Sequence, residues 1–469
     1  MIRTISTSLL RLASLVLLVI ACTNSDDPMP TGMGNSVESF VFAGFSQPVS
    51  AVVDSVALTI RATVPIGTDL TKLVPTITLS PNAVVTPGSG VAQNFSNPVS
   101  YTVTGADNKR QAYTVSVSVA SPATNVGTIV YIGNEVGNFL AVDGGTGAVK
   151  WRVSTGAAIS ASAFVSAGMV FTGAENGNLY AFDAKTGTQR WKYSTGKAIL
   201  SSPVVSGTLV FAGSEDQVLY ALDVLTGALR WKFGTSGGIT SSPVVASGVV
   251  YFGSQDRTLY ALEAATGKQR WKFSAGDKIM SSPAIVGGLV YVGTDDYNLY
   301  ALDVTTGAIK WKFSTGGRVT SSPTVADGVV YVGSDDYNLY ALDAVTGTLK
   351  WKFSTGGRVT SSPAVSGGLV YIGSEDNTLY ALDTNTGTQR WKYGTGAGIS
   401  SSPLVYNGLV YFGGRDSGLY CLNAVSGVFW WRDPLDAKIS KSLSGQHELD
   451  WLRVGYQRWA AVMFGSDGC

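Results

Sequence analysis

Few side chains of this 469-residue sequence are of the types that perform covalent catalysis. Histidine occurs once, as His447, and cysteine three times, as Cys22, Cys421 and Cys469. A Ser-His-Asp or Cys-His site could use only His447, and a metal centre rich in histidine is excluded. No two cysteines are adjacent, and we assign His447 no role. This inventory argues against an enzyme that uses these groups.

Charged and aromatic residues cluster instead in short loops at a forty-residue spacing. Asp295-Asp296-Tyr297-Asn298 returns as Asp335-Asp336-Tyr337-Asn338, and Arg318 returns as Arg358. Because Tyr and Arg are enriched at the centres of protein interfaces, this pattern favours a binding surface. One alternative is that the opposite charges pair and solubilise a rim, and another is a calcium site built from carboxylate oxygens. We call the following set the candidate binding face: Asp295, Asp296, Tyr297, Arg318, Asp335, Asp336, Tyr337 and Arg358.

Composition excludes other classes of partner and of chain. The formal net charge is +1, so no whole-protein field favours nucleic acid. Charged residues make up 14% of the sequence, against roughly 25% in an average soluble protein. Hydrophobic residues make up 45%, which suffices for a large core, and the 56 glycines call for a structural explanation.

A forty-residue unit repeats eight times from Ile129 without an insertion. In the unit at 329–368 we expect strands at 329–333, 339–343, 349–353 and 359–365, the last one containing Ser361-Ser362-Pro363. Four short strands with tight turns in each unit predict the blade of a β-propeller. One tryptophan recurs in step in each copy: Trp151, Trp191, Trp231, Trp271, Trp311, Trp351, Trp391 and Trp431.

The recurring acid of the unit has a local structural explanation. In Asp343-Ala344-Val345-Thr346-Gly347 the Asp side chain can accept backbone N–H groups, and Gly takes the left-handed position without strain. We therefore interpret this Asp series as turn-forming rather than catalytic. Cys421 stands where the other copies have Ala, which indicates a buried structural thiol.

The motif Leu-Tyr-Ala-Leu-Asp-x-x-Thr-Gly-x-x-x-Trp resembles the pyrroloquinoline-quinone (PQQ) type of propeller repeat. The resemblance implies an all-β, eight-bladed propeller over 127–446, in which each Trp docks one blade onto the next. We expect Lys438–Leu443 to supply the strand that completes the first blade and closes the ring. Seven complete blades are the alternative.

Residues 37–120 predict a separate small β module. Val37–Phe42 alternates apolar and polar residues, as does Ser55–Val64, and two further strands flank the turn-rich Gly105–Lys109 as a hairpin. Several short strands in this length suit an immunoglobulin-like sandwich. The segment resembles the Ig-like modules of bacterial surface lipoproteins, which implies a stalk, with glycan binding as the alternative.

The two ends of the sequence lie outside these units. Residues 1–21 have the basic start and short apolar run of a signal peptide, and Val19-Ile20-Ala21-Cys22 resembles a lipobox. We therefore expect lipidation at Cys22, a polar tether over 22–36 and an outer-membrane anchor, with the protein periplasmic or surface-exposed. Residues 447–469 leave the repeat and carry one apolar helical stripe, which predicts a packing helix. A membrane role or an altered reading frame is the alternative for this tail.

These features together predict a non-catalytic, lipid-anchored cell-envelope protein whose propeller is a protein-binding scaffold without a cofactor. Its expected partners are envelope proteins, and its only membrane contact is the lipid anchor. The PQQ-repeat family also contains the B-component lipoprotein of the β-barrel assembly machinery, so one alternative is an outer-membrane protein assembly factor. The others are a surface glycan-binding protein and a PQQ-dependent dehydrogenase, for which the sequence lacks the family's adjacent cysteines, calcium ligands and insertions.

Overall fold

The computed structural model describes residues 34–44, 48–64, 68–119, 128–435, 439 and 444–447. These residues form an all-β protein, as predicted, with one short 3-10 helix, η1 (Leu70–Lys72). No helix within these ranges has the length and apolar character needed to cross a membrane. The signal peptide, Cys22 and the predicted tail helix lie outside the described residues, and so does Cys469.

The N-terminal module consists of two sheets that share one hydrophobic core. Phe40, Phe95, Tyr101 and Tyr113 are among the buried residues of this core. The rings of the first three pack edge-on or stacked against one another. Strands β4 and β8 pair in parallel, whereas the other pairs are antiparallel. The three-stranded sheet contains β2 (Val49–Ser50), β1 (Val37–Phe42) and β5 (Pro75–Leu79), and the five-stranded sheet contains β3 (Val52–Asp54), β4 (Thr59–Val64), β8 (Arg110–Val119), β7 (Val99–Thr104) and β6 (Val84–Thr86).

Local turns explain where this module follows the sequence prediction and where it differs. Strands β7 and β8 form the predicted hairpin, with the Gly105 amide donating to the Lys109 carbonyl at 2.9 Å. The strand expected at 55–64 begins only at Thr59, because the Asp54 carboxylate accepts the Val56 and Ala57 amides and turns the chain there. The glycine-free turn needs a positive φ of 55° at Leu58.

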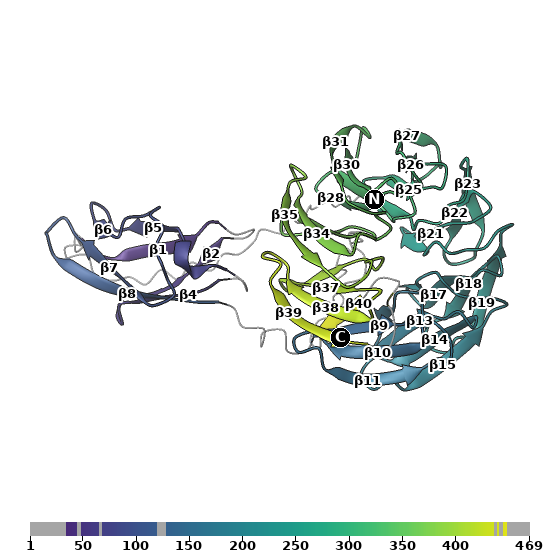
Figure 1. The fold of residues 1–469 in the computed structure, drawn as a ribbon, viewed down its shortest axis with the longest axis horizontal. Coiled ribbons are helices and arrows are strands. Elements are labelled where there is room, and N and C mark those ends of the chain that lie inside the picture. Colours follow the sequence, from purple (N-terminus) through teal and green to yellow (C-terminus); the bar gives the residue numbers. More distant parts are fainter. Residues whose placement is uncertain are drawn as a thin grey trace, which may run out of the picture.

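The remaining described residues form eight antiparallel four-stranded sheets arranged around a ring (Figure 1). The first strand of each sheet contacts the first strands of its neighbours, so these strands surround the axis. The first strands are β12 (Phe164–Ser166), β16 (Val204–Ser206), β20 (Val244–Ala246), β24 (Ala284–Val286), β28 (Thr324–Ala326), β32 (Ala364–Ser366), β36 (Leu404–Tyr406) and β40 (Ser444–His447). The second strands are β9 (Thr128–Gly133), β13 (Met169–Gly173), β17 (Leu209–Gly213), β21 (Val249–Gly253), β25 (Leu289–Gly293), β29 (Val329–Gly333), β33 (Leu369–Gly373) and β37 (Leu409–Gly413).

The third and fourth strands lead outward to the rim of the ring (Figure 1). The third strands are almost wholly buried, whereas the fourth strands alternate exposed and half-buried residues because they form the free edges. The third strands are β10 (Asn138–Asp143), β14 (Asn178–Asp183), β18 (Val218–Asp223), β22 (Thr258–Glu263), β26 (Asn298–Asp303), β30 (Asn338–Asp343), β34 (Thr378–Asp383) and β38 (Gly418–Asn423). The fourth strands are β11 (Val149–Ser154), β15 (Gln189–Ser194), β19 (Leu229–Gly234), β23 (Gln269–Ser274), β27 (Ile309–Ser314), β31 (Leu349–Ser354), β35 (Gln389–Gly394) and β39 (Phe429–Pro434).

The Ser-Ser-Pro segments precede the first strands and do not belong to them. In the unit at 329–368, the strand begins at Ala364 instead of including Ser361-Ser362-Pro363. The Ser361 hydroxyl exchanges hydrogen bonds with the backbone of Gly373, and proline has no N–H for a ladder, so neither residue continues the sheet.

The same shift moves the closing strand. The prediction placed it at Lys438–Leu443 and assigned His447 to the tail, and both assignments are wrong. The strand is β40, which pairs antiparallel with β9 from Ser444↔Tyr131 to His447↔Thr128. It therefore begins three residues beyond Lys441, which stands where the unit at 329–368 has Ser361, three residues before its strand. A strand far along the chain completes the first sheet.

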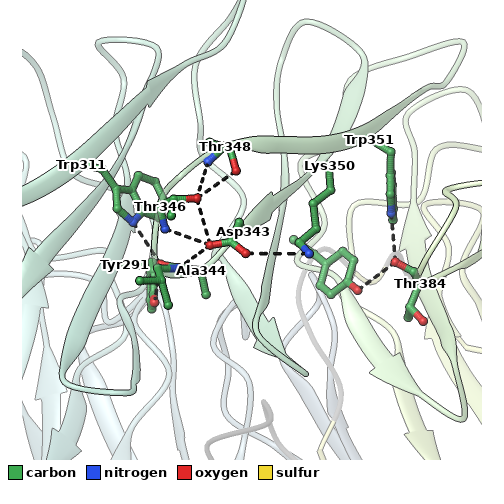
Figure 2. A network of polar contacts seen from close by, with 11 residues as sticks. Tyr291, Trp311, Asp343, Ala344, Thr346, Thr348, Lys350, Trp351 and Thr384 are labelled. Carbon is green, nitrogen blue, oxygen red and sulfur yellow. Dashed lines mark hydrogen bonds and ion pairs between the residues drawn. The ribbon is translucent and has the colours of Figure 1, made fainter.

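The recurring tryptophans connect each sheet to the next one (Figure 2). The Trp311 indole N–H donates to the Ala344 carbonyl at 3.0 Å, and the Tyr291 hydroxyl donates to the same oxygen. A Cβ added to Gly347, whose φ is 71°, would lie 2.6 Å from the Trp311 ring. Only glycine allows this close approach. Equivalent indole bonds run from Trp151 to Ala184, Trp191 to Val224, Trp231 to Ala264, Trp271 to Val304, Trp351 to Thr384, Trp391 to Ala424 and Trp431 to Gly144.

The acid of each repeated turn acts as the sequence predicted. Asp343 accepts the Val345 and Thr346 amides and the Thr346 hydroxyl, and Lys350 approaches its other oxygen (Figure 2). In the equivalent turn, the guanidinium of Arg190 contacts Asp183 at 2.6 Å and lowers the pKa of that carboxyl to about 2. Asn423 replaces the acid in the last sheet and accepts the same two amides. The turn therefore needs an oxygen acceptor, not a charge.

A belt of serines also links the sheets near the axis. The Ser322 amide donates to the Ser362 hydroxyl oxygen at 3.0 Å, and the Ser362 amide donates to that of Ser402 at 2.8 Å. Four further bonds of this kind continue the belt from Ser162 to Ser322. The belt therefore ties the segment that precedes one first strand to the equivalent segment of the next sheet.

Candidate binding face

Two kinds of loop meet at the candidate binding face. One kind joins the second and third strands of a sheet, and the other leads from one sheet to the next. The Thr315 amide donates to the Tyr297 carbonyl, the Gly316 amide to the Asp336 carboxylate and the Asp335 amide to the Arg318 carbonyl, all within 2.9 Å. The connection 315–318 therefore holds the loop of sheet β24–β27 against the loop of sheet β28–β31. The two loops that carry the predicted residues are therefore bonded to the same connection.

Asp296 and Asp336 are half-buried, and their carboxylates are bonded within their own surroundings. The Tyr300 hydroxyl donates to Asp296, and the Tyr340 hydroxyl to Asp336. Burial raises the pKa of both carboxyls, but hydrogen bonds outweigh it and hold each pKa below its usual range. Burial in turn raises the pKa of Tyr300 to about 12. These two acids hold the loops in shape and present no free acceptor to a ligand.

Tyr297 and Tyr337 are the exposed members of the face. Their side chains are 51% and 49% exposed, and their backbones have φ of 69° and 73°. A bulky residue in this left-handed region is unfavourable, and Gly177 and Asn377 occupy the equivalent position elsewhere in the ring. The left-handed conformation is shared by the equivalent residues of the other sheets, Gln217, Arg257 and Ser417 among them. The exposed tyrosine ring is what distinguishes these two neighbouring sheets.

Asp295 and Asp335 are more buried, and they differ in their partners. Asp335 lies 3.5 Å from the Arg318 guanidinium, whose side chain is about half exposed. Asp295 is only 9% exposed, and none of the described residues forms a hydrogen bond or ion pair with its carboxylate. Burial raises the pKa of both carboxyls above the usual range. Arg358 is exposed, and its carbonyl accepts the amide of Glu375.

Met280 is a residue of this face that the sequence analysis missed. Most other units have a hydroxyl at this position, with Leu200 as an exception. In two units it contacts the first loop residue: Ser160 donates to Glu175 at 2.7 Å, and Arg415 donates to Ser400 at 3.3 Å. In the unit of Asp295 the position is Met280, which is 37% exposed. An alignment of the eight units would have shown this single break in a Ser/Thr/Leu column.

Neither a metal cluster nor a reactive thiol stands out in the described part of the chain. No three His, Cys, Asp or Glu side chains there are grouped so that they could hold a metal ion. The predicted buried thiol is Cys421, which is inaccessible, and burial raises its pKa well above the ordinary value.

Comparisons with known proteins extend these observations. The family model described as outer membrane protein assembly factor BamB matches residues 134–241, 215–321 and 312–449, which together span more than half of the chain. The chain belongs to this family of PQQ-type repeats. A second model, described as SGBP, N-terminal, matches residues 37–117. Both matches agree with the resemblances that the repeat motif and the N-terminal module indicated.

Solved structures show the same ring. BamB from Moraxella catarrhalis is 22% identical with a TM-score of 0.54, and the match covers 64% of this chain and 89% of that one. The computationally designed protein Ika8 is 16% identical with a TM-score of 0.56, covering 64% and 96%. A europium-containing methanol dehydrogenase is 14% identical with a TM-score of 0.53, covering 62% and 81%. At these identities the likeness concerns the fold alone, and no curated protein matches significantly.

Proposed function

We propose that this chain is a non-catalytic binding protein of the cell envelope. In this proposal an eight-bladed propeller over 127–447 is the scaffold, an Ig-like module over 37–120 is its stalk, and Cys22 carries a lipid anchor in the outer membrane. The observation that carries the proposal is the pair Tyr297 and Tyr337, exposed and left-handed on adjacent sheets. The family match to BamB supports a scaffold that binds proteins.

The uniformity of the ring also supports binding rather than catalysis. The units 289–328 and 329–368 are identical at 31 of 40 positions, so few residues are left to specialise. The methanol dehydrogenase shares the fold alone, and no residue of its chemistry is carried over to this chain. We therefore propose no catalytic residue and no cofactor.

Two narrower functions follow from specific observations. The BamB match favours an outer-membrane protein assembly factor, whose partner would be a barrel-assembly protein. The SGBP match over 37–117 favours a surface protein that binds glycans. We rank the protein-binding scaffold first, because exposed Tyr and Arg side chains with mixed charges are typical of protein interfaces.

In-cell photo-crosslinking tests the proposal. A photoreactive phenylalanine analogue at Tyr297, in the full-length chain expressed in its native envelope, should give discrete adducts with one or a few proteins. The matched control places the analogue at Val345, which is 76% exposed on a strand-connecting turn outside the face. Equal adduct patterns from the two positions, or none from Tyr297, would contradict the binding face.

A further inference from the structure

Among the described residues, the face holds two buried carboxylate oxygens without a partner, Oδ1 of Asp295 and Oδ1 of Asp335, and of these two acids only Asp295 also lacks an ion pair. Asp295 is nine-tenths buried, and neither oxygen of its carboxylate is bonded by a described residue. A buried carboxylate without a donor is costly, because burial removes water without replacing its hydrogen bonds. At the equivalent position Glu175 is bonded by Ser160 and Glu375 by Arg415, whereas Asp335 contacts Arg318 through one oxygen only and leaves its Oδ1 without a partner.

One sequence difference near Asp295 distinguishes its unit from those of Glu175 and Arg415. Met280 stands where Ser160 supplies a hydroxyl to Glu175, so the side chain that would satisfy Asp295 is a thioether without a donor. The Asp295 amide bonds to the Lys278 carbonyl, which fixes the loop although the Lys278 ammonium makes no bond to the carboxylate. Tyr297, two residues from Asp295, adds an exposed aromatic ring at the same place.

We infer that the Asp295 carboxylate, which we call the socket, binds a cationic side chain of a protein partner. This inference deepens the proposed function and rests on it. An arginine guanidinium fits best, because it pairs with a carboxylate and stacks on a tyrosine ring at the same time. Rotation about the Cβ–Cγ bond of Asp295 lets either oxygen accept the incoming N–H.

The surrounding charges further restrict which partner sequences could bind. Lys278 and Arg318 are exposed beside the socket, and they would repel a uniformly basic segment. Asp277 and Asp335 are also close enough to raise the pKa of Asp295, so the neighbourhood is mixed in sign. The partner segment is therefore an arginine flanked by acidic residues, with the acids facing Lys278 and Arg318.

Ligand-observed NMR titration of the full-length chain tests this assignment. The probe is the peptide Ac-Ser-Asp-Arg-Asp-Ser-NH2, compared with the same peptide carrying citrulline, which keeps the shape but loses the charge. We expect the arginine peptide to bind about tenfold or more tightly than the citrulline peptide. Equal affinities, or no binding of the arginine peptide at 10 mM or below (on the order of the weakest useful affinity), would overturn the inference.

Three variants make the test specific to Asp295. Asp295→Asn should weaken binding of the arginine peptide about tenfold. Met280→Ser places a hydroxyl where Ser160 donates to Glu175, so it should also weaken binding by satisfying Asp295 internally. The matched control is Glu215→Gln, at the equivalent position of another sheet, which should leave the affinity unchanged. Loss of binding by Glu215→Gln, or unchanged binding by Asp295→Asn, would refute the socket.

The two proposals fail in different ways. If Tyr297 crosslinks to a protein but binding shows no dependence on arginine, the scaffold stands and the socket is wrong. Neutral oligosaccharides such as cellohexaose and maltohexaose form the rival arm of the titration. Saturable binding of an oligosaccharide at this face, together with no binding of the arginine peptide, would overturn both the socket and the protein-binding function. It would favour a glycan-binding function instead.

Discussion

Side chains of one type have different tasks in this ring because their immediate neighbours differ. Asp183 is held by backbone amides and Arg190, Asp296 by a tyrosine hydroxyl within its own loop, and Asp295 by nothing described. The first arrangement lowers the pKa of the carboxyl, and the last one raises it. The contributions of Asp183 and Asp295 to the free energy of unfolding should therefore change with pH in opposite directions.

Asp183→Ala should destabilise the protein by about 1–2 kcal/mol at neutral pH, because it removes the acceptor of two backbone amides. Asp183→Asn should have a much smaller effect, since Asn423 already performs the same task. The pKa of Asp183 in the folded state, about 2, lies below the unfolded value near 3.9. Its stabilisation is therefore complete above the unfolded pKa and is lost as the pH falls through about 2.

Thermal unfolding of both variants from neutral pH down to acid measures this prediction. An Asp183→Ala variant as stable as the wild type at neutral pH would contradict the role of the turn.

Asp295→Asn should stabilise the free protein by about 1 kcal/mol at pH 7, because it removes an unpaired buried charge. The folded-state pKa of Asp295 is raised above the unfolded value, so the penalty is present at high pH and disappears as the pH falls through the folded pKa. The melting temperatures of the variant and the wild type should therefore converge in acid. A variant that melts lower than the wild type at pH 7 would show that Asp295 has an internal partner.

At the scale of elements, a turn joins the third and fourth strands of each sheet, and the tryptophan side chain of the neighbouring sheet packs against that turn. The Trp311 ring lies over Gly347, its indole N–H bonds to Ala344, and the Asp343 side chain organises the same turn. One short turn thus joins two strands of its own sheet and also contacts the neighbouring sheet. A repeating chain can build a stable ring in this way because every junction uses the same few residues.

Gly347→Ala should destabilise the protein by about 2–4 kcal/mol, since a Cβ there strains a positive φ and clashes with Trp311 at 2.6 Å. Gly368→Ala is the matched control, because Gly368 has a similar φ of 75° but nothing within 4 Å of an added Cβ. The control should cost about 1–2 kcal/mol from backbone strain alone. Equal losses in denaturant unfolding would show that the Trp311 contact contributes nothing.

The sequence predicted the strands and turns of the ring better than the use of its loops. Trp311, Gly347 and Asp343 each have one structural role that follows from the residue type. Because these positions recur with the repeat, the sequence alone indicates those roles. Asp295 and Asp296 are adjacent identical residues, and only the folded structure shows that Tyr300 bonds to Asp296 while no described residue bonds to Asp295. The serine belt was also missed, because its bonds join residues forty positions apart on neighbouring sheets.

At the scale of the whole molecule, a strand far along the chain completes the first sheet. Strand β40 pairs with β9, and the Trp431 and Tyr411 side chains of the last sheet bond to the Gly144 carbonyl of the first. The first and last sheets of the repeat are therefore hydrogen-bonded to each other, and β9 is paired along both edges. Closure of this kind protects against edge-to-edge aggregation.

Truncation before Ser444 should lower the melting temperature and produce oligomers, because it removes β40 and exposes the edge of β9. Truncation after His447 is the control, since it retains β40 and should leave the ring monodisperse and as stable as the full chain. Size-exclusion chromatography and thermal unfolding measure both. Identical behaviour of the two truncations would contradict closure by β40.

The most direct test of the binding face is a loop exchange within the ring. Asp295→Glu with Tyr297→Asn, and Asp335→Glu with Tyr337→Asn, convert two loops toward the sequence that the chain itself uses at 375–377. The measurement is the set of proteins that copurify with the tagged chain after brief crosslinking in intact cells, quantified by mass spectrometry against the wild type. We predict an unchanged melting temperature and a loss of about tenfold or more in one or a few partners. The same partners at the same yield would contradict the face as the site of binding.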